Sequence, residues 1–144
     1  MSFDGSILLT LQSIRTPFLT GFFTVISEFG SESIQLPLVA FLFWSFDKRS
    51  AIRIGINYFL IMYVTQILKI AFCIPRPWLR FEGLTSATNY AGEVSGFSFP
   101  SGHTSGAVSI YGTMMTTTKK RWIQIAFAVL ILLVGFSRLY LGVP

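Results

Sequence analysis

Four basic residues lie at or near the ends of apolar stretches: Lys69, Arg76, Arg80 and Arg138. A cation at the centre of a bilayer costs roughly 2.5–3.5 kcal/mol, and less near the interface. One such residue is explained by a long side chain that reaches the lipid headgroups. When several such basic residues converge, a bound anion becomes the better explanation. Phosphate suits them, because arginine binds its oxygens with a planar fork and lysine adds a compact charge.

A second group of residues, Pro100-Ser101-Gly102-His103, opens a stretch with helical spacing over about 101–118. Such a segment can place the backbone N–H groups of Ser101 and Gly102 at a helix N-terminus, where an anion is favoured. The imidazole of His103, with an ordinary pKa of about 6.5, is suited to protonating a leaving alkoxide at neutral pH. The alternative is that His103 is a hydrogen-bonded polar residue in a bundle core.

Three short patterns follow one another along the chain: K-x6-R-P from Lys69, P-S-G-H from Pro100, and S-R-L-Y-L-G-V from Ser137. In this order they resemble the signature of the type-2 phosphatidic acid phosphatase and vanadium haloperoxidase superfamily. The resemblance covers about residues 69–143, and the preceding apolar segments fit the membrane-embedded branch of that superfamily.

The resemblance implies a role for each matching residue. Lys69, Arg76 and Arg138 would hold the phosphoryl oxygens, Ser101 and Gly102 would assist them, and His103 would act as the general acid. It implies neither a metal nor a cofactor. Arg80 matches no motif position, so headgroup contact is its expected role.

The third pattern departs from the family at one position. The family continues S-R-x5-H-x3-D, with a histidine that forms a phosphohistidine and an aspartate that orients it. Here the histidine position holds Pro144, and His103 is the only histidine in the sequence. We therefore expect an inactive chain, forming one domain over residues 1–144 that is incomplete at its C-terminus. Truncation and a noncatalytic variant both remain open.

The composition predicts that these residues are set in a membrane. Hydrophobic residues make up 52% of the chain and charged residues 12%, with a mean hydropathy of +0.64. Soluble domains carry about 25% charged residues. The net charge of +5 does not indicate nucleic acid, because the basic residues form short clusters between apolar runs.

The apolar pattern predicts an all-α fold, a polytopic transmembrane helix bundle with an interfacial helix at residues 4–14. Further helices are expected at 17–29, 34–46, 54–72, 101–118 and 122–143, and the runs 17–29 and 34–46 are short for full spans. Small residues recur at three- and four-residue spacing in 101–118, which favours close helix packing inside the bundle.

The basic clusters predict an orientation. Clusters at 48–53 and 119–121 are expected on the cytoplasmic side. Threading the segments in order puts Arg15 on that side too. It puts residues 30–33, the loop 78–99 and the C-terminus on the other side. The expected location is therefore the plasma membrane, with the site facing the extracytoplasmic side.

Three functions agree with this pattern. The first is a metal-independent lipid-phosphate phosphatase, acting on phosphatidic acid, its lyso form or isoprenoid diphosphates. The second is a membrane protein that binds a lipid phosphate, or phosphate itself, through Lys69, Arg76 and Arg138 without hydrolysis. The third is a structural or transport role in which the cations contact headgroups. The oligomeric state is left open.

Overall fold

A computed structural model describes residues 10–45, 47–75 and 97–143, and within them it contains helices and no strand. This confirms the all-α prediction. The helices are α2 (Pro17–Glu28), α3 (Glu32–Ser45), α4 (Lys48–Phe72), α6 (Gly102–Thr117) and α7 (Arg121–Leu141). The expected interfacial helix at 4–14 lies mostly outside the described residues, although residues 10–13 are helical.

Two helices, α4 and α7, are long and apolar enough to cross a membrane. Only 22% of the most apolar window of α4 and 11% of that of α7 are buried within the bundle. The core helix of a soluble protein would be mostly buried, so these surfaces are suited to lipid. Trp44 and Trp122 are 88% and 69% exposed beside the basic clusters, where membrane proteins place aromatic residues at the interface.

Local sequence determines where helices α2 and α4 begin. Thr16 caps α2 by accepting a hydrogen bond from the Leu19 amide, and Pro17 occupies the first turn, where its missing N–H costs nothing. Asp47 caps α4. The Ser50 hydroxyl and the amides of Ser50 and Arg49 donate to the Asp47 carboxylate, and these hydrogen bonds lower its pKa.

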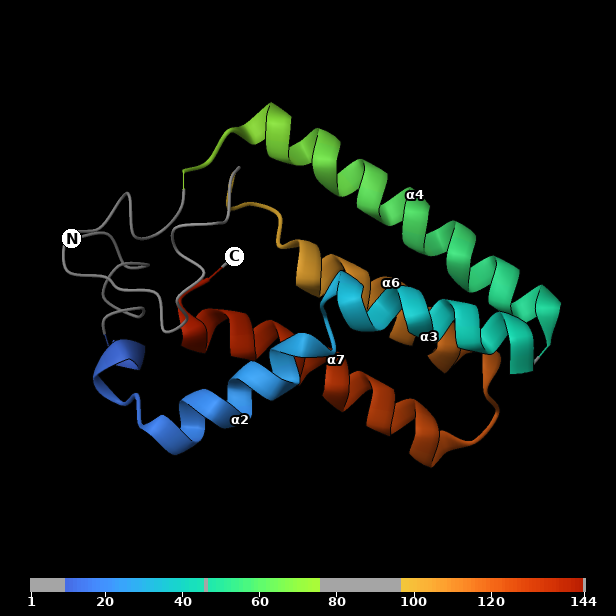
Figure 1. Cartoon of the computed structure of the whole chain (residues 1–144), viewed down its shortest axis with the longest axis horizontal. Coiled ribbons are helices and arrows are strands. Elements are labelled where there is room, and N and C mark those ends of the chain that lie inside the picture. The colour runs from blue at the N-terminus through green and yellow to red at the C-terminus, as the bar shows by residue number, and fades with distance from the viewer. Residues whose placement is uncertain (1–9, 46, 76–96, 144) are drawn as a thin grey trace.

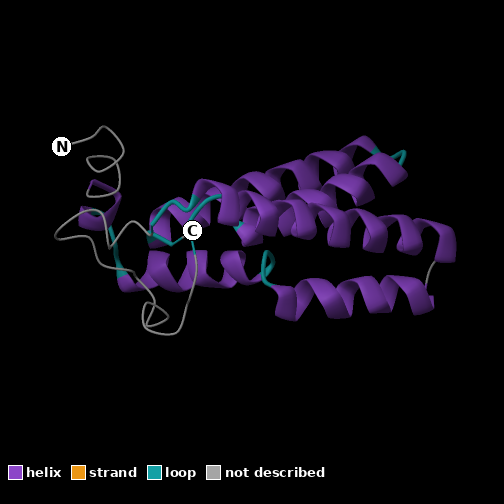
Figure 2. Cartoon of the chain, turned by 90° about the horizontal axis from the view of Figure 1, so that it is seen from above, coloured by secondary structure: helices purple, strands orange, loops and turns teal. Residues whose placement is uncertain are grey.

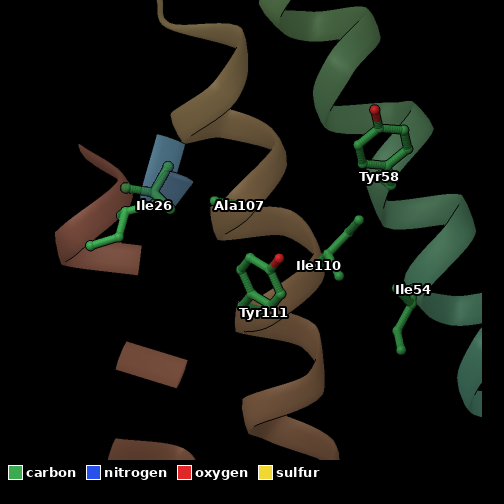
Figure 3. Close-up of a cluster of buried hydrophobic side chains, with 7 residues drawn as sticks. Ile26, Ile54, Tyr58, Ala107, Ile110 and Tyr111 are labelled. Atoms are coloured by element: carbon green, nitrogen blue, oxygen red, sulfur yellow. The ribbon is translucent and has the colours of Figure 1, made fainter. Parts of the chain in front are cut away.

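Helix α6 lies at the centre of the bundle and packs against α3, α4 and α7. Figure 3 shows Ala107, Ile110 and Tyr111 of α6 between Ile26 on one side and Ile54 and Tyr58 of α4 on the other. Ala107 and Ile110 are fully buried. The small residues of α6 allow this close approach, which agrees with the packing predicted for residues 101–118.

Helices α2 and α3 run in the same direction, from the end of the bundle that holds the C-terminal end of α7 to the end that holds the α6–α7 connection (Figure 1). Figure 2 shows the same bundle from above, with its helices joined by loops. A turn at Phe29–Ser31 separates them. The Phe29 carbonyl accepts hydrogen bonds from the Tyr111 hydroxyl at 2.8 Å and from the Gln35 amide at 3.4 Å. The two short apolar runs, 17–29 and 34–46, therefore follow one another along the bundle and cross it once. We call this single crossing, interrupted by the turn, the broken passage.

This passage corrects part of the predicted orientation. The Arg15 guanidinium donates through Nε to the Tyr140 carbonyl at 3.1 Å. Tyr140 lies in the last turn of α7, at the opposite end from Arg121. The prediction that Arg15 shares a side with the basic clusters is therefore wrong, because it counted two crossings where the chain makes one. Gly30 and Ser31 are buried between helices rather than set in an outer loop.

The close packing of α6 predicts a difference between two of its glycines. A Cβ on Gly106 would collide with Gln35 Oε1 and lie 3.0 Å from its Cδ, whereas a Cβ on Gly112 meets nothing within 4 Å. Gln35 is 1% exposed, so it has little room to move. We expect Gly106→Ala to destabilise the protein by about 1–3 kcal/mol. Gly112→Ala should be neutral or slightly stabilising. Thermal unfolding in detergent measures both, and equal effects would contradict this packing.

The single broken passage predicts which positions share a side of the membrane. In a Cys73→Ser background, we expect cysteines at Lys48 and Lys119 to react with an impermeant thiol reagent from one side. A cysteine at Ser13 should react only from the other. Labelling of all three from the same side of sealed vesicles would contradict the arrangement of α2 and α3.

Candidate active site

Three predicted site residues lie at helix ends on one end of the bundle. Lys69 is in the last turn of α4, His103 is the second residue of α6, and Arg138 is in the last turn of α7. These ends come together because α6 runs in the opposite direction to α4 and α7 (Figure 1). Arg76 and Arg80 lie outside the described residues.

The Lys69 ammonium lies beside the first turn of α6. A Cβ built on Gly102 would be 3.8 Å from Lys69 Nζ and 3.9 Å from Met62 Cε, so a larger side chain there would occupy the space next to the ammonium. Ser101 is the N-cap of α6, and its Oγ accepts from the Thr104 amide at 3.4 Å and the Thr104 hydroxyl at 3.1 Å. The Ser101 hydroxyl still has a proton to donate.

The first backbone N–H groups of α6 add to the positive potential near Lys69. The amides of Gly102 and His103 have no acceptor within the helix, because the first N–H groups of any α-helix lack one. Together with the helix dipole they favour a negatively charged group at this end of α6.

His103 is partly buried and is close to both cations. The positive charges of Arg138 and Lys69 act on its imidazole. The α2–α3 turn packs against the same residue: a Cβ on Gly30 would lie 3.0 Å from the His103 carbonyl oxygen and 2.8 Å from Val134 Cγ1. Three residues predicted from separate motifs therefore meet in one place.

Arg138 contacts a residue that the sequence analysis did not single out. Its Nη1 donates to the hydroxyl of Ser27 in α2 at 2.7 Å, and Ser27 is 2% exposed. The preceding motif residue, Ser137, is fully buried and donates to the Val134 carbonyl at 2.7 Å, which makes it a structural residue of α7. In the sequence, Ser27 is marked only by its position as a polar residue within an apolar run.

The two ends of the long α4–α6 connection are joined next to the site. The Ser98 amide donates to the Ile74 carbonyl at 2.9 Å. The rings of Phe72 and Phe99 pack edge to face with centroids 5.6 Å apart. These contacts hold the end of α4 against the start of α6, and thereby keep Lys69 close to His103.

The arrangement suits a small oxyanion. Two cations, a helix N-terminus and an imidazole lie at the same end of the bundle, and together they offer both charge and hydrogen-bond donors to phosphoryl oxygens. Within the described residues, no three histidine, cysteine, aspartate or glutamate side chains lie close enough to hold a metal ion.

The fold defines a membrane-embedded helix bundle with two cations, a histidine and a helix N-terminus at one end. The particular family follows from comparison: the chain belongs to the PAP2 superfamily, whose model matches residues 50–143.

Two relatives of known function share sequence with most of the chain. Phosphatidylglycerophosphatase B from Bacillus subtilis is 28% identical over 99% of this chain and 72% of its own length. Undecaprenyl-diphosphatase from Sulfolobus acidocaldarius is 25% identical over 94% of this chain and 64% of its own length. The chain thus spans about two thirds to three quarters of these proteins.

Two crystal structures share the fold. The transmembrane PAP2-type phosphatidylglycerolphosphate phosphatase from Bacillus subtilis superposes with a TM-score of 0.82 at 27% identity, over 97% of this chain and 72% of that one. LpxE from Aquifex aeolicus superposes with a TM-score of 0.84 at 27% identity, over 99% of this chain and 83% of that one. Both share the fold of this chain, and the first is a transmembrane protein.

The contact between Gly30 and His103 predicts a sensitive position. We expect Gly30→Ala to displace the backbone of His103, because a carbonyl 3.0 Å from the new Cβ cannot yield as a flexible side chain does. The expected cost is about 1–3 kcal/mol, measured as a lower unfolding midpoint. Gly55→Ala, where the new Cβ meets Val39 Cγ1 at an ordinary 3.6 Å, is the control. A loss as large in the control would contradict the prediction.

Proposed function

We propose that this protein recognises lipid phosphates through a PAP2-type phosphate site. In this proposal Lys69, Arg76 and Arg138 bind the phosphoryl oxygens, Ser101 and Gly102 contribute at the start of α6, and His103 is the general acid. The observation that carries the proposal is geometric: Lys69 Nζ lies 3.8 Å from a Cβ built on Gly102, next to His103, and Arg138 lies in the last turn of α7 at the same end of the bundle. Like charges placed around one side chain are stabilised when an anion lies between them.

A lipid headgroup is the most suitable source of that anion. The site lies at one end of a bundle whose long helices expose apolar surface, so a lipid can place its tail beside the helices and its phosphate at their ends. The names of the two relatives contain a phosphorylated phospholipid and an isoprenoid diphosphate. We propose phosphatidic acid, its lyso form and isoprenoid diphosphates as candidate ligands.

The position of the basic clusters supports an orientation for the site. Lys48 and Lys119 lie at the opposite end of the bundle from His103 (Figure 1). By the positive-inside rule, that end is cytoplasmic. We therefore propose a protein of the cytoplasmic membrane whose phosphate site faces the extracytoplasmic side, and in which residues 1–144 form one domain.

The chemistry of residue 144 limits what residues 1–144 do by themselves. The phosphatase reaction that the family resemblance implies begins with attack of an imidazole nitrogen on phosphorus, while His103 gives a proton to the leaving oxygen. Proline at position 144 offers only an amide nitrogen, whose lone pair is delocalised into the carbonyl. We propose that residues 1–144 bind the lipid phosphate without forming a phosphohistidine.

The test is to purify the chain in detergent and to measure its binding to dioleoyl phosphatidic acid in mixed micelles, with phosphatidylcholine as the reference lipid. We expect selective binding and no release of phosphate. Lys69→Ala and Arg138→Ala should each weaken binding about tenfold or more, because a hydrogen bond to a charged group contributes about 1.5–3 kcal/mol.

Arg53→Ala, an exposed arginine in the N-terminal part of α4, is the matched control and should bind as the wild type does. Phosphate release that His103→Ala abolishes would show that the chain is a phosphatase as it stands. Unchanged binding by Lys69→Ala and Arg138→Ala would instead favour the structural role for these cations.

A further inference from the structure

We infer that Ser27 is a positioning residue for the phosphate site: its hydroxyl orients the Arg138 guanidinium toward the bound oxyanion. This inference rests on the proposed function and adds to the site a residue of α2. Ser27 lies outside residues 50–143, the part of the chain that the family model matches.

The contact is short and buried. Arg138 Nη1 donates to Ser27 Oγ at 2.7 Å, across 111 residues of sequence. Ser27 is 2% exposed, so water competes little for its hydroxyl. A charge-assisted hydrogen bond at this distance, from a donor whose planar geometry is rigid, fixes the direction in which the guanidinium points.

The uncharged acceptor is important for an anion site. A guanidinium has five N–H donors, and Ser27 accepts from one of them through an oxygen that carries no formal charge. A carboxylate in the same place would pair with Arg138 and compete with phosphate. A serine orients the arginine without placing a negative charge beside it. This orientation, in place before binding, reduces the conformational entropy that a long side chain loses when it binds.

Helix α2 is held against α7 on both sides of Ser27. Phe23 packs on Tyr140 with ring centroids 4.5 Å apart and on Phe136 at 5.6 Å. Beyond Ser27, Gly30 lies against Val134 and the backbone of His103. The serine therefore cannot drift from Arg138 unless the whole α2–α7 contact opens. One turn of the chain thus contacts the phosphate-binding arginine and the general acid.

The test compares Ser27→Ala with Ser31→Ala in the detergent-purified chain, using binding to dioleoyl phosphatidic acid in mixed micelles. Both changes remove one buried hydroxyl from the same region, and the Ser31 hydroxyl has no hydrogen-bond partner among the described residues. We expect Ser27→Ala to weaken binding about tenfold and Ser31→Ala to leave it unchanged.

A double-mutant cycle separates positioning from a general structural effect. If Ser27 acts through Arg138, adding Ser27→Ala to Arg138→Ala should cause no further loss of affinity. An equal loss in both backgrounds, or a similar loss in Ser31→Ala, would show that the change merely disturbs the turn.

These measurements distinguish failure of the proposed function from failure of the role of Ser27. Wild-type protein that binds phosphatidic acid no better than phosphatidylcholine would overturn the proposed function and this inference with it. Wild-type affinity in Ser27→Ala, together with lost affinity in Arg138→Ala, would overturn the role of Ser27 alone.

Discussion

The Lys69 and Arg138 cations lie at the same end of the bundle as the partly buried His103, and this placement is the constraint on which the proposed site depends. Like charges near a low-dielectric interior separate unless the backbone holds them or an anion lies between them. The bundle supplies the backbone, since each residue sits at the end of a helix packed against its neighbours. The proposed phosphate supplies the anion.

Helix α6 provides most of that support. Its small residues let α3, α4 and α7 approach closely, and the buried Gln35 amide occupies the space that Gly106 leaves open. The same helix begins with the serine cap and the histidine of the site. Packing and chemistry therefore depend on one element, because a change in how α6 sits between its neighbours also moves His103 relative to Lys69.

Helix α2 and the α2–α3 turn add residues to the proposed site that lie outside its three sequence motifs. Ser27 contacts Arg138, and Gly30 contacts the backbone of His103. Helix α2 is thereby more than a lipid-facing helix that precedes the PAP2 segment. In the proposed phosphate site, assembled from helix ends, the buried neutral hydroxyl of Ser27 orients the long arginine side chain without adding a negative charge.

The sequence by itself determined the all-helical membrane class and the positions of Lys69, His103 and Arg138, because apolar periodicity and motif spacing are local properties. It also determined that position 144, where the motif spacing predicts a histidine, holds proline. Only the tertiary structure decided that α2 and α3 make one passage, that Arg15 lies beside Tyr140, and that Ser27 contacts Arg138. These contacts join residues more than a hundred positions apart, and no local pattern of hydrophobicity or charge records which helix faces pack together.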